Sequence, residues 1–314
     1  MHLIHLVLLL FLFFLLLLLD YLLFLCFLYT LYLFHFSKEF FCCLGFTFWN
    51  CFRDFRESTL FQCSLILFPL LFDDKAEAYR QLGIYGACFK VAVVMVMFIQ
   101  AFRYAYEPFI FAKNKNEGNT KAYAEAMKYF IIFSLLIFLG VMFYIDIIKY
   151  FVGSRYYDGL QVVPIVMMGE LFFGIYFNLS FWYKLIDQTQ WGAYFSLIGC
   201  AATVLIIVLF APHYGYMACA WASFSCNLLI MLLSYFIGQK KYPIQYDLKS
   251  AGTYFNLAAV CYIAGMYVPI DSEILRLAYR TAILLLFLTF IIKKDLPLSE
   301  LPYVGRFFHK RHES

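Results

Sequence analysis

The sequence predicts an all-α, polytopic helical membrane protein, and three observations support this prediction. Hydrophobic residues make up 64% of the 314 residues and charged residues only 14%, whereas an ordinary soluble domain has about 25% charged residues. Between Leu82 and Ile292, seven apolar stretches of membrane-spanning length are separated by short polar loops. A bilayer core about 30 Å thick needs roughly 20 apolar residues per helix. This composition excludes a soluble enzyme.

All seven stretches should be helices, because backbone amides in lipid must be hydrogen-bonded within their own segment. The stretches are also too continuous for the alternating strands of an outer-membrane barrel. The expected spans are residues 84–102, 129–148, 160–183, 192–211, 216–237, 254–270 and 275–292. They form the second of three predicted regions, 76–292, which precedes a basic tail over 293–314.

The basic residues are divided unequally between alternate loops, and this division predicts the orientation, since cytoplasmic loops are enriched in Lys and Arg. One set of loops and ends has thirteen: Lys113, Lys115, Lys121, Lys128, Lys184, Lys240, Lys241, Lys249, Lys293, Lys294, Arg306, Lys310 and Arg311. The other set has six: Lys75, Arg80, Lys149, Arg155, Arg276 and Arg280. The C-terminus should therefore be cytoplasmic. The net charge of +4 is modest for this length, and nucleic acid is not an expected partner.

Residues 1–75 have a different composition from the rest of the chain. They contain no alanine, a single glycine and half of the ten cysteines, although helices in lipid pack through small residues. Two interpretations stay open for this atypical Leu/Phe/Cys-rich segment. It is either a hydrophobic anchor, as one long or two poorly packed membrane helices, or the product of a shifted reading frame or misplaced start.

The first span of the 76–292 region has the most charge, with Lys90, Gln100, Arg103 and Glu107 on one helix. Lys90 lies too deep for easy snorkelling to the interface, so it should face a cavity or a partner such as Glu170. Gln100, Arg103 and Glu107 recur at three- and four-residue spacing and so share one face, where an Arg103–Glu107 pair is the simplest arrangement.

Glu170 lies in the middle of the third span and is the one deep carboxylate that could couple an ion to transport. Asp146 and Lys184 lie near span ends and are interpreted as interfacial. Tyr104 and Tyr176 could stack on sugars. No histidine is spaced with a second metal ligand inside a span, and no Gly-rich phosphate loop is present, so we expect neither a metal nor a cofactor.

Three stretches resemble a known transporter family: QLGIYGACFKVAVVMVMFIQAFRYAYEPF, FNLSFWYKLIDQTQWGAYFSLIGCAATV and PHYGYMACAWASFSCNLLIMLLSYFIGQKKYPIQYD. Over residues 79–250 the chain is similar to the C-terminal half of polysaccharide-export flippases. These are the Wzx-like branch of the multidrug/oligosaccharidyl-lipid/polysaccharide flippase superfamily. Members have two pseudo-symmetric helical lobes, and such internal repeats are common in transporters.

The resemblance implies a multi-pass protein of the bacterial inner membrane and a transport function rather than an enzymatic one. Its substrate would be a polyprenyl diphosphate-linked oligosaccharide, moved across the membrane during O-antigen, capsule or exopolysaccharide biosynthesis. Lys90 and Arg103 would contact the diphosphate, with Gln100 and Glu107 beside them, since a diphosphate in a low-dielectric region needs fixed cations.

The chain departs from this family because the N-terminal lobe is missing. Either the product is truncated and has no transport activity of its own, or a second chain completes a half-transporter. Two other functions stay open. One is a membrane polymerase or acyltransferase of polysaccharide assembly, which needs a larger external loop or a His/Asp pair. The other is a non-transporting membrane scaffold, whose intramembrane charges would pair with each other.

Overall fold

The computed structural model describes residues 68–72, 74–113, 120–186, 188, 190–268 and 271–295. Over these ranges all regular structure is helical, which confirms the predicted all-α class. The prediction for residues 1–75 and that for the tail 293–314 fall almost wholly outside the described residues.

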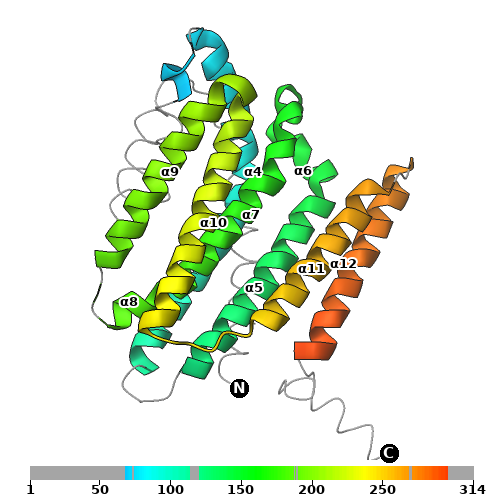
Figure 1. The fold of residues 1–314 in the computed structure, drawn as a ribbon. Coiled ribbons are helices and arrows are strands. Elements are labelled where there is room, and N and C mark those ends of the chain that lie inside the picture. Colours follow the sequence, from blue (N-terminus) through cyan, green and yellow to red (C-terminus); the bar gives the residue numbers. More distant parts are fainter. Residues whose placement is uncertain are drawn as a thin grey trace, which may run out of the picture.

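Long helices alternate in direction along the chain (Figure 1). In order, they and the short helices between them are η1 Phe68–Leu70, α4 Lys75–Lys113, α5 Thr120–Phe143, α6 Ile145–Val152, η2 Ser154–Gln161, α7 Val162–Leu179, α8 Phe181–Leu185, α9 Gln190–Tyr214, α10 Tyr216–Lys241, α11 Leu248–Tyr267 and α12 Glu273–Asp295. The α4, α7, α10 and α12 helices run one way, and α5, α9 and α11 return the chain.

Six helical segments of the described chain are long and apolar enough to cross a membrane. They are Lys75–Glu107, Thr120–Phe143, Ser154–Leu185, Gln190–Tyr214, Tyr216–Lys241 and Glu273–Asp295. The sixth predicted span, 254–270, falls on α11, which has 20 residues but is not among these six segments. Because α10 ends and α12 begins at opposite ends of the bundle, α11 must bring the chain back across it (Figure 1).

The first two predicted spans differ most from the observed helices in their boundaries. The first begins nine residues earlier than expected and continues to Lys113, because a helix does not have to stop where the apolar residues stop. The second ends early, at Phe143, and the chain turns into the short helix α6 before Gly153. Gly153 has φ of 87°, a backbone conformation that favours glycine and ends α6.

The packing places α7 at the centre of the bundle. The α10 helix packs along α7 and α9, while α4 and α5 both contact α7, and α11 and α12 pack on α5 (Figure 1). Small residues allow the close approaches, as is usual between membrane helices. A Cβ added at Gly169 of α7 would lie 3.1 Å from the Phe224 Cα of α10. Likewise, Gly174 lies against the Phe130 ring of α5.

Polar contacts fix α12 at the end where its C-terminus lies. The Asp295 carboxylate accepts hydrogen bonds from the Lys128 ammonium of α5 and from the Tyr254 hydroxyl of α11. The Tyr129 hydroxyl also donates to the Asp295 carbonyl, at 3.3 Å. The apolar length of α12 is largely exposed, with Leu286 at 68%. These side-chain hydrogen bonds therefore join the C-terminal end of this edge helix to α5 and α11.

Candidate functional site

The Lys90 side chain is exposed on the outside of the described bundle. Four of the exposed residues of α4 are separated by multiples of seven, Ala76, Gly83, Lys90 and Tyr104, although Met97 between the last two is partly buried. Seven residues complete nearly two turns, so these four residues follow one side of the helix, and we call them the outer stripe of α4. A Cβ added at Gly83 would meet no atom within 4 Å, so the stripe is open there.

The structure does not bring Lys90 and Glu170 together, which was one of the two environments considered for Lys90. Glu170 is 7% exposed, on the central helix α7. Its neighbour Gly169 lies against the backbone of Phe224, so this part of α7 is enclosed by α10. The ion pairs between described residues do not include one between Lys90 and Glu170. Lys90 is exposed, and the prediction that it faces a cavity stays a prediction.

Arg103 and Glu107 belong to a mixed cluster of charged and aromatic side chains with Phe177, Phe181 and Lys184, which we call the α4–α8 cluster. The Glu107 Oε1 atom lies 3.1 Å from the Lys184 Nζ atom. Lys184 Nζ is 4.9 Å from the centroid of the Phe177 ring and 4.8 Å from that of Phe181. The Arg103 guanidinium lies 5.1 Å from the same Phe177 centroid. Two cations from different helices therefore contact the same aromatic ring, and each contact is favoured by the quadrupole of the ring.

The observed partner of Glu107 is Lys184, where the sequence suggested Arg103. These two residues are 77 positions apart, so helical spacing could not reveal their contact. Lys184 lies in the last turn of α8 and joins this helix to α4. Gln100 lies one turn before Arg103 with its Oε1 atom buried. Gln100, Arg103 and Glu107 are all partly buried.

The outer stripe and the α4–α8 cluster are separate places on α4. Lys90 and Arg103 are 13 residues apart, which is about 20 Å along the helix axis and about 140° around it. One diphosphate group cannot contact both side chains at the same time. A role for both residues therefore requires either two bound positions of one substrate or two different ligands.

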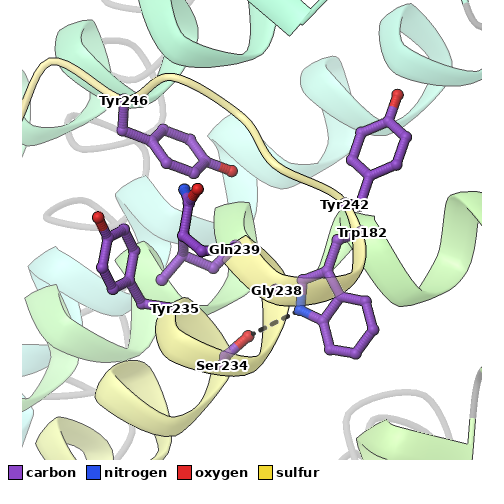
Figure 2. Close-up of a pocket in the computed structure, with 8 residues that line it drawn as sticks. Trp182, Ser234, Tyr235, Gly238, Gln239, Tyr242 and Tyr246 are labelled. Carbon is purple, nitrogen blue, oxygen red and sulfur yellow. Dashed lines mark hydrogen bonds between the residues drawn. The ribbon is translucent and has the colours of Figure 1, made fainter.

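A pocket lies near the α4–α8 cluster, where α8 meets the end of α10 (Figure 2). The Trp182 Nε1 atom donates to the Ser234 hydroxyl at 3.3 Å, and Tyr235 and Tyr246 flank Gln239 in the same view. The pocket volume is about 10 Å³, which is room for about one water molecule. This pocket cannot hold a sugar.

The two tyrosines considered for sugar stacking differ in exposure. Tyr176 is 6% exposed and its hydroxyl lies 3.2 Å from that of Tyr183, so its ring is not available to a ligand. Tyr104 is 54% exposed and belongs to the outer stripe. Of the two, Tyr104 alone can contact a molecule outside the described bundle.

Comparison of the chain with protein-family models, curated proteins and solved structures finds no match. Within the described ranges, no group of three or more His, Cys, Asp or Glu side chains could hold a metal ion. The observations that bear on function are therefore the chain's own: a multi-pass helical membrane bundle with a lysine exposed in one span and a cluster of cations near the end of the same helix.

Proposed function

We propose that this chain forms one lobe of a two-lobe flippase that moves a polyprenyl diphosphate-linked oligosaccharide across the bacterial inner membrane during surface polysaccharide biosynthesis. The exposure of Lys90 in the first span carries the proposal. A lysine at the bilayer centre costs about 2.5 to 3.5 kcal/mol on insertion scales. Exposure to lipid alone would impose this cost, whereas a water-filled cavity shared with a second lobe would remove it.

The chemistry of the outer stripe fits such a cavity. Lys90 supplies a point charge for a phosphate, and Tyr104, at 54% exposure, offers an aromatic face. Gly83 leaves space beside them. In a non-transporting scaffold, the intramembrane charges would pair with each other. Lys90 has no ion pair with another residue of the described chain, which disfavours that alternative.

The α4–α8 cluster lies at the end of the bundle that has most of the lysines, which is the cytoplasmic end if basic loops stay inside. We therefore place the C-terminus in the cytoplasm. In this orientation a diphosphate entering from the inner leaflet would meet Arg103, Lys184 and Glu107 first and Lys90 afterwards. The planar guanidinium of Arg103 suits bidentate binding of phosphate oxygens. Gln100, one turn further in, would lie beside the path.

Glu170 is the buried carboxylate for which we propose ion coupling. It is 7% exposed on the central helix, and intramembrane carboxylates commonly mark proton relays in transporters. A second lobe, supplied by another chain, would complete the transport cavity. If the chain is instead a truncated product, the same residues would bind the substrate but would not move it.

Binding and movement should therefore be measured separately with the purified full-length protein. A short-chain polyprenyl diphosphate is titrated in neutral detergent into the wild type and into the Lys90→Gln, Arg103→Gln and Arg80→Gln variants. Arg80 is exposed at the opposite end of α4 and serves as the control. We expect each of the first two changes to weaken binding about tenfold and the control to bind like the wild type. Equal binding by all four proteins would refute the assignment. Transbilayer movement in proteoliposomes then distinguishes an active half-transporter from a truncated product.

A further inference from the structure

The two ends of the bundle differ in charge. At the end where α4 begins, six basic and six acidic side chains of the described chain cancel: Lys75, Arg80, Lys149, Arg155, Arg276 and Arg280 against Asp74, Glu77, Asp146, Asp158, Asp271 and Glu273. At the other end, eight lysines face four carboxylates: Lys121, Lys128, Lys184, Lys240, Lys241, Lys249, Lys293 and Lys294 against Glu107, Glu125, Asp247 and Asp295. Those twelve described side chains sum to a net charge of +4, to which Arg103 of the α4–α8 cluster adds one more positive charge.

Four of these lysines form two adjacent pairs with the same arrangement. Lys240 and Lys241 end α10, and Lys293 and Lys294 lie in the last turn of α12. The second lysine of each pair lies over aromatic rings. Lys241 Nζ is 4.8 Å from the centroid of the Trp191 ring. Lys294 Nζ is 5.1 Å from the Tyr254 centroid and 5.7 Å from that of Phe290.

The first lysine of each pair is differently placed. Lys240 and Lys293 are both exposed, and neither forms an ion pair with a residue of the described chain. The negative end of a helix dipole favours a lysine in the last turn. The helix dipole does not account for two adjacent lysines, one of them without an ion pair to a described residue, or for the aromatic ring beneath the other.

A membrane surface accounts for both features. Trp and Tyr rings concentrate at the depth of the lipid headgroups, and a lysine stem lying along a ring keeps its ammonium at that depth. Four ammonium groups at one end of the bundle would then face the phosphate layer of one leaflet. Each juxtamembrane lysine increases the affinity of a protein for an anionic lipid surface about fivefold.

We propose that the two lysine pairs at the ends of α10 and α12 bind the headgroup phosphates of anionic phospholipids, with Trp191 and Tyr254 positioning Lys241 and Lys294. This surface is separate from the outer stripe of α4, and the inference does not depend on transport. The partner is a lipid of the surrounding leaflet, held by its charged headgroup and by its acyl chains in the bilayer.

The test compares lipid binding by the full-length protein in neutral detergent. Phosphatidylglycerol, phosphatidylcholine and inorganic phosphate are each titrated, and bound lipid is counted by native mass spectrometry. We expect the wild type to retain phosphatidylglycerol in preference to phosphatidylcholine, and inorganic phosphate not to displace it. A variant with Lys240, Lys241, Lys293 and Lys294 all changed to Gln should lose this preference by about 600-fold, at about fivefold for each lysine.

A matched control removes four positive charges from the opposite end, with Lys75, Arg80, Lys149 and Arg155 changed to Gln. Lys149 also lies over a ring, that of Tyr150, at 5.6 Å, so the control tests whether a lysine over a ring is sufficient. We expect the control to retain phosphatidylglycerol like the wild type. Equal losses in both variants, or no loss in either, would overturn the proposal. Displacement by inorganic phosphate would show a free-anion site instead.

Discussion

The Arg280 Nη1 atom lies 2.8 Å from the Asp146 Oδ2 atom, and this contact joins α12 to α6. The same guanidinium donates from Nε to the Gly265 carbonyl at 3.0 Å and from Nη1 to the Phe143 carbonyl at 3.2 Å. Arg276 also contacts Asp146, at 3.1 Å. One buried arginine thus satisfies carbonyls near the C-terminal ends of α5 and α11, which have no partners within their own helices.

Replacing Arg280 by Met should destabilise the protein by about 1 to 3 kcal/mol, because the two carbonyls and Asp146 lose hydrogen bonds to a charged donor. Thermal unfolding in detergent measures the effect. Arg80→Gln breaks the exposed pair with Glu77 and should change the midpoint little. A midpoint for Arg280→Met that matches this control would show that the contact between α12 and α6 contributes nothing to stability.

Two glycines of α11 should respond differently to the same change. A Cβ at Gly265 would lie 2.5 Å from Cε1 of the Phe143 ring, whereas a Cβ at Gly252 would meet nothing within 4 Å. Gly265→Ala forces the packed ring to move and should cost about 1 to 3 kcal/mol. Gly252→Ala should be neutral or slightly stabilising, since alanine favours helix. Equal unfolding midpoints for the two variants would show that α11 does not pack against Phe143 as described.

Asp247 caps the first turn of α11, and its Oδ1 atom accepts from the Ser250 amide at 3.1 Å. Hydrogen bonds from Ser250 lower the pKa of this carboxyl below its ordinary value of 3.8. A carboxyl whose pKa is lowered in the folded state stabilises the protein at pH values above its pKa in the unfolded state. This contribution is lost as the pH falls below about 4 and passes through the lowered pKa of the folded state.

As the pH falls from about 5 to below about 4, the wild type should therefore lose more stability than Asp247→Asn. Asn retains the cap but does not titrate. The difference between the unfolding midpoints of the two proteins, followed against pH, isolates this single carboxyl. A constant difference across the acidic range would mean that Asp247 has the same pKa in the folded and unfolded states.

Lys90→Leu tests whether Lys90 has a structural role. Because Lys90 is exposed and has no ion pair with another described residue, we expect a stability within about 0.5 kcal/mol of the wild type in detergent. Its binding of a polyprenyl diphosphate should fall nonetheless. A large loss of stability would instead indicate that Lys90 supports the fold, and the loss of binding could not then be assigned to a direct contact.

The helical class and most spans could be predicted because they depend on local composition. A run of apolar residues must form a helix in lipid wherever it lies in the bundle. The ends of α4 and α5 differ from the predicted ones, because neither the extension of α4 to Lys113 nor the break after Phe143 is recorded in hydropathy. The face shared by Gln100, Arg103 and Glu107 also follows from spacing. Their partners do not, because Phe177 and Lys184 come from helices elsewhere in the sequence.

Sequence alone determined that this chain is a multi-pass helical membrane protein with charged residues in its first span, because bilayer thickness and backbone hydrogen bonding act on each segment separately. Only the tertiary structure decided which way those charges face. The structure exposes Lys90 on the outside of the described bundle, and it pairs Glu107 with Lys184 and Asp146 with Arg280. Each of these outcomes depends on how distant helices pack, and helix packing fixes both the rotation of a helix about its axis and the neighbours that its polar residues reach.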